Sequence, residues 1–183
     1  MSFQIYEASI KGIFIIQSEV FGDSRGHFLE TWSKKDFSLA GIDANFVQDN
    51  QSKSVRGVLR GLHFQKQFPQ GKLVRVISGE VFDVAVDLRF NSITFGKWFG
   101  IILSGTLQNQ LYVPPGFAHG FFVLSDKVIL TYKCTEFYHP EDEGGIKWDD
   151  PTIGINWPNS GLSPLLSEKD IKLPLFNKTK KYF

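Results

Sequence analysis

Short apolar runs separated by turn signals recur along most of the chain. Runs of this length, bounded by Gly, Pro, Ser, Asn and Asp, are typical of β-strands. The runs lie at 12–21, 27–32, 57–65, 72–78, 80–88, 98–104, 109–114, 120–125 and 127–138. Between neighbouring runs we expect Ser78-Gly79 and Ser125-Asp126 to form hairpin turns.

The run "VFDVAVDL" shows the clearest alternation with a period of two. In an extended strand, successive side chains point to opposite faces of the sheet. One face would carry Phe82, Val84, Val86 and Leu88, and the other Val81, Asp83, Ala85 and Asp87. The second face therefore combines apolar side chains with two carboxylates.

Helix signals are few. The segment 33–41 has Ser33 as a candidate N-cap and Gly41 as a stop signal, and 167–172 could form a short terminal turn. Many strands at regular spacing with few helices favour an all-β sandwich or jelly-roll barrel of antiparallel strands over a parallel α/β sheet. We find no repeat or linker, so a single domain over 1–183 is expected.

Composition narrows the possible partners. The chain has 183 residues, 18 of them Phe, and a formal net charge of +1. It lacks the basic surplus of a nucleic-acid binder, so an anionic ligand requires a local cluster of cations. No apolar run approaches membrane-spanning length, and the N-terminal segment does not read as a signal peptide. The single cysteine, Cys134, cannot build a disulfide framework, and we expect a cytoplasmic protein.

Two stretches carry the spacing of cupin signatures. "VPPGFAHGF" contains Pro-x-Gly-x-x-His, ending at His119. The other cupin signature has a His-x-His pair and then a Glu six residues before a Gly. Here His63 is followed by Gln65 in place of the second His, and Lys72 stands at the Glu position, before Gly79. An ammonium group has no lone pair and would repel a cation, so we predict a pocket without a metal.

Six strings extend the likeness over nearly the whole chain. "FVQDNQS", "GVLRGLHFQ", "QGKLVRVISGEVFDVAVDLR", "VPPGFAHGFFVLS", "LTYKCTEFY" and "WDDPTIGINWP…LSEKD" follow in this order. Together they resemble the dTDP-4-dehydrorhamnose 3,5-epimerase family of metal-free cupins. The resemblance implies inversion of C3 and C5 of a dTDP-linked 4-keto-6-deoxyhexose, with neither a metal nor a redox cofactor.

The resemblance also implies catalytic roles. Both carbons flank the C4 carbonyl, so each can lose a proton as an enolate forms, which requires a base, an oxyanion stabiliser and an acid. His63 would be the base, held and stabilised by Asp170. Lys72 would face the C4 oxygen, Tyr132 would donate the proton, and His119 would contact the substrate from the pocket wall.

Nucleotide contacts follow from the same resemblance. Arg60 would clamp the diphosphate and Tyr138 would stack on the thymine, while Gly61 would let the backbone approach the ligand. Further substrate contacts would come from Arg25, Glu30, Gln48, Asp49, Asn50, Glu143 and Lys169. In the family the segment carrying Arg25 and Glu30 crosses to a partner subunit, so we expect a homodimer with an exchanged N-terminal segment. Residues 160–183 would form a C-terminal extension.

Other interpretations remain open at this stage. Tyr132 and His119 could be ordinary core residues, and Asp170 a helix cap or surface carboxylate. The motifs do not exclude an epimerase acting at C3 only or C5 only, or one acting on another nucleotide-linked 4-keto sugar. A metal-dependent cupin is disfavoured by Lys72, and a non-catalytic sugar-binding cupin would leave His63 and Tyr132 without a purpose.

Overall fold

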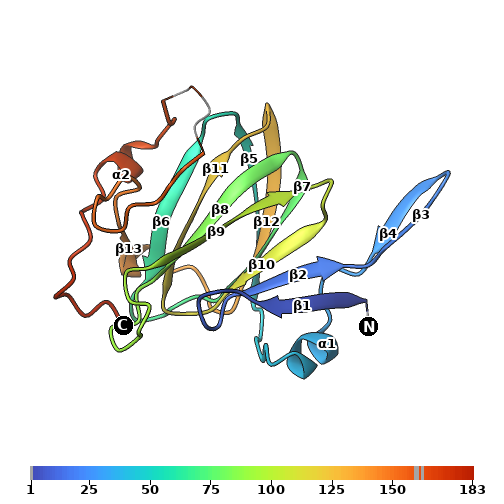
Figure 1. Cartoon of the computed structure of the whole chain (residues 1–183), viewed down its shortest axis with the longest axis horizontal. Helices are drawn as coiled ribbons and strands as arrows, with labels where there is room; N and C mark the ends of the chain where they lie inside the picture. Colours follow the sequence, from blue (N-terminus) through green and yellow to red (C-terminus); the bar gives the residue numbers. More distant parts are fainter. Residues whose placement is uncertain (1, 159–160, 162) are drawn as a thin grey trace.

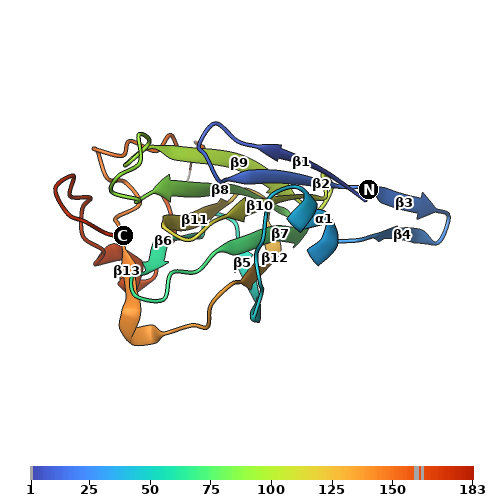
Figure 2. The ribbon, with the colours of Figure 1, turned by 90° about the horizontal axis from the view of Figure 1, so that it is seen from below.

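Two antiparallel sheets face each other and enclose the core (Figures 1 and 2). The computed structural model describes residues 2–158, 161 and 163–183. The six-stranded sheet has the order β1 (Phe3–Glu7), β2 (Phe14–Ser18), β10 (Asn109–Val113), β7 (Lys72–Ser78), β12 (Lys127–Cys134), β5 (Gln48–Val55). The five-stranded sheet has the order β13 (Glu143–Gly145), β6 (Leu59–Gln65), β11 (Phe117–Val123), β8 (Glu80–Asp87), β9 (Trp98–Ser104). The predicted all-β architecture of antiparallel strands is confirmed.

Helical structure is sparse, as expected. The described residues contain α1 (Lys34–Leu39), α2 (Glu168–Ile171) and the short 3₁₀ helix η1 (Pro140–Asp142). The predicted cap is present, because Ser33 Oγ accepts a hydrogen bond from the Asp36 N–H, and Gly41 follows the helix with a positive φ. No helix in the described part of the chain is long and apolar enough to cross a membrane.

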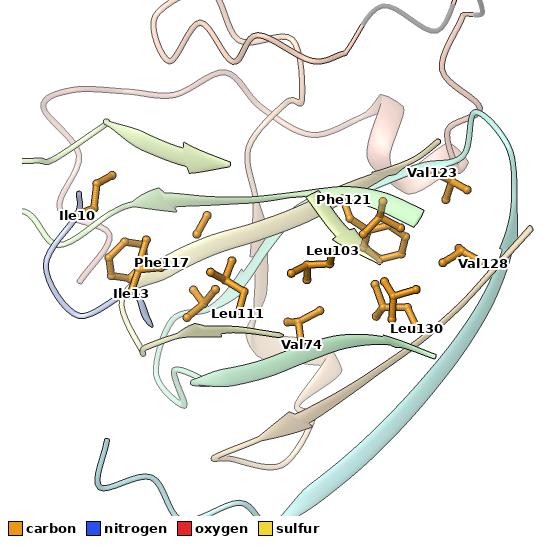
Figure 3. Close-up of a cluster of buried hydrophobic side chains, with 14 residues drawn as sticks. Ile10, Ile13, Val74, Leu103, Leu111, Phe117, Phe121, Val123, Val128 and Leu130 are labelled. Carbon is orange, nitrogen blue, oxygen red and sulfur yellow. The ribbon is translucent and has the colours of Figure 1, made fainter. Parts of the chain in front are cut away.

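Three apolar clusters explain how the layers are held. The first fills the space between the sheets and includes Val74, Leu111, Phe121 and Leu130 (Figure 3). The second lies on the outer face of the five-stranded sheet, where the C-terminal segment covers Val84, Val86 and Leu88 with Ile153, Phe176 and Tyr182. The third joins α1 to the six-stranded sheet through Phe37 and Leu73. The alternation of "VFDVAVDL" thus divides one strand between two cores, both buried.

The two predicted hairpin turns have another role. Ser78-Gly79 joins β7 to β8 and Ser125-Asp126 joins β11 to β12, and in each case the two strands belong to different sheets. Both turns are therefore crossings between the layers, and the hairpin prediction was wrong. They pack against each other, because a Cβ on Gly79, whose φ is +87°, would lie only 2.2 Å from Lys127 O. Only glycine fits this contact.

Three strands were not predicted from the sequence. β5 carries the polar segment "QDNQSKSV", in which Ser54 is the one buried residue, so it gives no apolar signal. β1 and the three-residue β13 were also missed. The run at 12–21 divides into β2 and β3 (Val20–Asp23). β3 pairs with β4 (Gly26–Leu29) in a hairpin that projects away from both sheets (Figures 1 and 2).

Candidate active site

A pocket with a volume of about 410 Å³ is lined by residues of both sheets and of the C-terminal segment. Every predicted site residue lines it except Arg25, Glu30 and Asp49. β6 and β11 of the five-stranded sheet supply His63 and His119, and β7 and β12 of the six-stranded sheet supply Lys72 and Tyr132. Residues more than a hundred positions apart therefore form one cavity.

His63 lies between two carboxylates. Its Nε2 is 2.6 Å from Asp170 Oδ1 and its Nδ1 is 3.1 Å from Glu143 Oε1. These are close contacts rather than well-directed hydrogen bonds, since His63 Nδ1 and Asp170 Oδ1 have no hydrogen-bond partner of good geometry. The His63 side chain is 24% exposed, so the ring reaches the cavity while both carboxylates are largely shielded.

Local structure at α2 holds Asp170. Ser167 caps the helix by accepting a hydrogen bond from the Asp170 N–H, and its hydroxyl donates in return to Asp170 Oδ2 at 2.7 Å. Burial acts to raise the pKa of the Asp170 carboxyl, but the contacts with His63 and Ser167 outweigh it and lower that pKa. Asp170 is therefore a buried, ionised carboxylate beside His63.

Glu143 connects His63 to the rim of the pocket. Its Oε2 accepts a hydrogen bond of 2.7 Å from the Tyr138 hydroxyl and forms an ion pair with Lys169 Nζ. Burial acts to raise the pKa of Glu143, but these two donors and the nearby His63 lower it. The hydrogen bond to Glu143 requires a protonated phenol and is the main reason that the pKa of Tyr138 is raised to about 12; burial and the negative charge of Glu143 add to this. Glu143 and Lys169 are thus bound to protein groups as well as facing the cavity.

Lys72 and Cys134 are cross-strand partners on the opposite wall. Desolvation lowers the pKa of the Lys72 ammonium, and the nearby Cys134, Glu143 and Asp83 oppose this only in part. The Cys134 thiol is buried and accepts a contact of 3.6 Å from Asn50 Nδ2. A desolvated cation on the pocket wall is a feature of functional sites more often than of surfaces. Lys72 is therefore not an ordinary surface lysine on the outer face of its strand.

Tyr132 lies on the same wall as Lys72, across the cavity from His63. Burial, the largest cause, raises the pKa of the Tyr132 hydroxyl, Cys134 and Glu143 add to this, and Arg60 opposes it. The hydroxyl is therefore protonated at neutral pH and can donate a proton. Tyr132 also packs against the central core, so it is both a core aromatic and a pocket residue.

His119 also combines two roles. It lines the pocket, yet its side chain is only 9% exposed and its Nε2 lies 2.9 Å from Oδ1 of the fully buried Asp83. Asp83 points inward from β8, on the face that the alternation of "VFDVAVDL" assigned to carboxylates. The hydrogen-bonded core histidine and the pocket histidine considered from the sequence are thus the same residue.

The side chains of the segment Gln48–Asn50 point to two different sides of strand β5. Because side chains alternate along β5, Gln48 and Asn50 face the pocket, and Gln48 Nε2 donates to Asn50 Oδ1 at 2.9 Å. Asp49 faces the other way, into a second groove, and forms an ion pair of 2.5 Å with Lys133. Arg60 lines the pocket, and its Nε donates to Ser54 Oγ at 3.2 Å.

Arg25 and Glu30 lie far from this pocket. Arg25 is in the turn of the projecting β3–β4 hairpin, where it forms an ion pair of 2.5 Å with Asp23, and Glu30 follows β4 (Figure 1). Phe28 on the hairpin is 70% exposed and Phe21 51% exposed. Within one chain, the hairpin contributes nothing to the pocket.

Gly61 lies at a close approach of two strands. A Cβ at this position would lie 2.7 Å from Gly120 Cα and 2.7 Å from His119 O, and its φ is +111°. This close approach is between β6 and β11, where the strand register shifts after His119. Gly61 therefore allows the two histidine strands to meet.

Sequence reasoning gave no role to several groups in or next to the pocket wall. Cys134 and Ser167 line the pocket and the fully buried Asp83 contacts His119, but these three were quoted only in strings or patterns, and Gln65 was noted only as a lost histidine. The alternation in "VFDVAVDL" was a usable signal for Asp83. The spacing of Ser167 and Asp170 was a second usable signal, since a helix-capping serine bonds a residue three positions later. Cys134 and Gln65 could not be found, because their partners come from distant segments. Among the described residues, no group of three or more His, Cys, Asp or Glu is arranged to hold a metal ion.

Comparison with known proteins agrees with this geometry. The family model described as dTDP-4-dehydrorhamnose 3,5-epimerase matches residues 7–178. The dTDP-4-dehydrorhamnose 3,5-epimerase of Methanothermobacter thermautotrophicus is 57% identical over 169 residues, covering 92% of this chain and 91% of the relative. A crystal structure of dTDP-6-deoxy-D-glucose-3,5-epimerase from Legionella pneumophila in complex with dTDP-4-keto-L-rhamnose superposes with a TM-score of 0.91 at 50% identity, covering 94% and 92% of the two chains.

A more distant neighbour has a narrower activity in its description. A 3'-monoepimerase from Streptomyces bikiniensis, solved in complex with dTDP-quinovose, gives a TM-score of 0.87 at 33% identity, covering 93% of this chain and 86% of that one. The fold and the pocket define a cupin-like sugar-nucleotide epimerase. Within that class, the chain belongs to the dTDP-4-dehydrorhamnose 3,5-epimerase family.

Proposed function

We propose that the protein inverts C3 and C5 of dTDP-4-dehydro-6-deoxy-D-glucose, giving dTDP-4-dehydro-L-rhamnose. The observation that carries this proposal is that His63 and Tyr132 face one pocket from opposite sheets. Inversion of a carbon requires that the proton leaves from one face and returns on the other. A base and an acid on opposite walls meet that requirement.

His63 acts as the base on this proposal. Its imidazole takes the C3 proton, and the electron pair of the C–H bond moves into an enolate whose charge rests on the C4 oxygen. Asp170, 2.6 Å from Nε2, stabilises the imidazolium that results. The Lys72 ammonium on the opposite wall stabilises the enolate oxygen, and its desolvated position strengthens the interaction.

Tyr132 completes the inversion. Its hydroxyl donates a proton to C3 from the face opposite His63, and the ketone at C4 forms again. The phenolate and the imidazolium then exchange protons with solvent, so the enzyme returns to its starting state. The same sequence at C5 inverts the second centre. No electron leaves the substrate, so the proposed chemistry has no step for a redox cofactor, and Lys72 supplies the positive charge at the C4 oxygen.

The nucleotide occupies the outer end of the pocket on this proposal. The exposed Arg60 guanidinium binds the diphosphate, and the half-exposed ring of Tyr138 stacks on the thymine. Gln48, Asn50, His119, Glu143 and Lys169 complete the contacts from within the chain. Because the C-terminal segment supplies Lys169 and Asp170, we propose that residues 1–183 act as one unit.

Deuterium exchange in heavy water tests the two faces. With His63→Ala, both exchange at C3 and C5 and inversion should be abolished, because no other base is assigned. With Tyr132→Phe, exchange should continue, because His63 can return a proton to the original face, while inversion falls about 10²–10⁴-fold. Proton NMR of the sugar ring measures both quantities. Normal inversion in Tyr132→Phe, or undiminished exchange in His63→Ala, would show that the assignments are wrong.

The same experiment distinguishes an enzyme that inverts both C3 and C5 from one that inverts a single carbon. Wild-type enzyme should incorporate deuterium at both C3 and C5 and yield the doubly inverted sugar. Incorporation at C3 alone would identify a monoepimerase, and turnover of another nucleotide-linked 4-keto sugar in preference would change the substrate. Both outcomes retain His63 and Tyr132 in their roles.

We also propose a C2 homodimer in which the β3–β4 hairpin of each chain delivers Arg25 and Glu30 to the partner's pocket. The support is the projection of this hairpin and the exposure of Phe21 and Phe28 on it (Figure 2). Apolar rings on a two-stranded hairpin need a covering surface to be stable in water. The enzyme is proposed to work in the cytoplasm, where its one thiol remains reduced.

Mixed dimers test this arrangement. In a dimer of one Arg25→Ala chain and one His63→Ala chain, exchange of the hairpin would leave one site with both His63 and Arg25 intact. Activity at low substrate should therefore reappear when the two variants are co-expressed. If each site were built within one chain, no intact site would form, and activity would stay at the level of Arg25→Ala. A monomer at micromolar concentration in sedimentation would also refute the proposal.

A further inference from the structure

Gln65 is a buried amide on the pocket wall whose donors are already occupied. It is the last residue of β6 and is 3% exposed. Its Nε2 donates to Phe68 O at 2.8 Å and to Phe137 O at 3.0 Å, and its Oε1 accepts from the His139 N–H at 2.9 Å. An amide has two N–H donors, and both end on main-chain carbonyls. The side chain therefore has no donor left for a ligand.

These three hydrogen bonds join two loops at the rim of the pocket. The first loop follows β6 and contains Phe68, and the second follows β12 and contains residues 137–139. The ring of Phe68 also stacks on His139, with centroids 4.2 Å apart. The Asp142 carboxylate accepts hydrogen bonds from the main-chain N–H groups of Gln67 and Phe68. The two loops thus form one bonded unit, with Gln65 beneath it.

The residue enclosed by these bonds is Tyr138. Gln65 bonds the carbonyl of Phe137 on one side and the N–H of His139 on the other. The N–H of Tyr138 itself donates to Gln48 Oε1 at 3.0 Å. The main chain is therefore fixed on both sides of a ring that is itself 50% exposed. A ring held in place before binding loses less conformational freedom when a ligand stacks on it.

We propose that Gln65 is a positioning residue that sets the affinity for the nucleotide by holding Tyr138 in its stacking position. The proposal rests on the proposed role of Tyr138 in binding the base. Gln65 stands where a metal-binding cupin has the second histidine of its His-x-His pair. In this chain the residue at that position is turned toward the main chain of the rim, and it serves the nucleotide and not a metal.

A double-mutant cycle with Gln65→Met and Tyr138→Ala tests this, with dTDP as the titrated ligand. Methionine keeps the size of the side chain and removes all three hydrogen bonds. We expect Tyr138→Ala to weaken dTDP binding about tenfold and Gln65→Met about fivefold, and the double variant to be no weaker than Tyr138→Ala. In turnover assays, Gln65→Met should raise KM and leave kcat within about twofold, because the catalytic groups are unchanged.

A matched control separates positioning from stability. Asn109 is also a buried amide with two main-chain hydrogen bonds, to Ser104 N and Ile102 O, on strands that do not line the pocket. Asn109→Ala should lower the melting temperature without changing the Kd for dTDP. If Gln65→Met does not fold, Gln65→Glu keeps the acceptor for His139 and loses both donors, so the same loss of affinity is expected. Hydrogen exchange at the amides of Tyr138 and His139 should become faster in either Gln65 variant.

The outcomes distinguish the two proposals. If Tyr138→Ala leaves dTDP affinity unchanged, the proposed stacking role is wrong and the role of Gln65 falls with it. If Tyr138→Ala weakens dTDP binding but Gln65→Met does not, only the inference about Gln65 is overturned. The same holds if the loss of affinity in the double variant equals the product of the two single losses. A fall in kcat at unchanged KM in Gln65→Met would likewise overturn it.

Discussion

Two histidine–carboxylate pairs lie next to each other in the pocket, and they differ in where the carboxylate originates. His63 and His119 are cross-strand partners on β6 and β11. His119 receives Asp83 from the neighbouring strand β8, so its pair is complete within the sheet. His63 receives Glu143 from the short edge strand β13, which pairs with β6, and Asp170 from α2 in the C-terminal segment. The His119 pair therefore belongs to the sheet, and the His63–Asp170 pair is completed by the C-terminal segment.

Exposure differs in the same direction. The His63 side chain is 24% exposed and that of His119 is 9% exposed. A base must reach a substrate proton, whereas a buried pair with little exposure mainly satisfies its own hydrogen bonds. On the proposed roles, similar residue pairs differ in function through their access to the cavity: the buried His119–Asp83 pair lies within the sheet, and the more exposed His63–Asp170 pair is the one proposed to react.

The largest expected effect comes from exchanging the two carboxylates for amides. Asp170→Asn should lower kcat about 10²–10⁴-fold, because the imidazolium of His63 loses its stabilising charge. Asp83→Asn should instead lower the free energy of unfolding by about 1.5–3 kcal/mol, the value of a hydrogen bond to a charged group, with a smaller change in kcat. Urea denaturation and steady-state kinetics on both variants measure this. Equal losses of kcat would mean that the two pairs share one role.

On the opposite wall of the pocket, the Lys72→Met substitution should lower the activity and raise the thermal stability. Without the cation, the enolate loses its stabilising charge and kcat should fall about 10²–10³-fold. The variant should melt at a higher temperature than wild type, since desolvation lowers the pKa of the ammonium and its charged form is unfavourable in the fold. This advantage should shrink as the pH rises through the lowered pKa. A lower melting temperature for Lys72→Met at neutral pH would contradict the reasoning.

The two carboxylates beside His63, Asp170 and Glu143, should make the stability of the protein depend on pH in the acid range. The pKa values of Asp170 and Glu143 are lowered from 3.8 and 4.5 in the folded protein. A carboxyl with a depressed pKa contributes stability that is present above its ordinary pKa and is lost as the pH falls through the folded value. Asp170→Asn and Glu143→Gln should therefore lose less stability than wild type on acidification, by denaturant unfolding at several pH values. A steeper loss in either variant would reverse the expected sign.

The smallest effect is expected from metal removal. The cavity places Lys72 where a metal-binding cupin has its carboxylate ligand, and the amide of Gln65 is bonded to the main chain. Exhaustive chelation should therefore leave turnover unchanged, and elemental analysis of the pure protein should show no stoichiometric transition metal. A bound metal whose removal abolishes turnover would instead make His63 and His119 ligands, and the contrast between them would disappear.

The sequence alone identified much of the pocket. Apolar runs bounded by turn signals predicted β7 and β9 at their observed bounds. The spacing of the cupin signatures led to His63, Lys72 and His119, and the family resemblance added Tyr132; the structure brings all four to one cavity. The strands were accessible because apolar periodicity is local, and the signature residues because a motif is read from residue type and spacing. The cap at Ser33 was predictable for the same reason.

Only the tertiary structure decided which elements meet. Polar β5 became a strand because it pairs with β12, not because its own sequence favours one. The turn at Ser78-Gly79 crosses between sheets because both faces of β8 are buried, a choice that short-range turn chemistry cannot make. Asp170 reaches His63, and Gln65 reaches Phe137, through folding of distant segments onto one rim. Such contacts depend on three-dimensional proximity, which the order of residues does not encode locally.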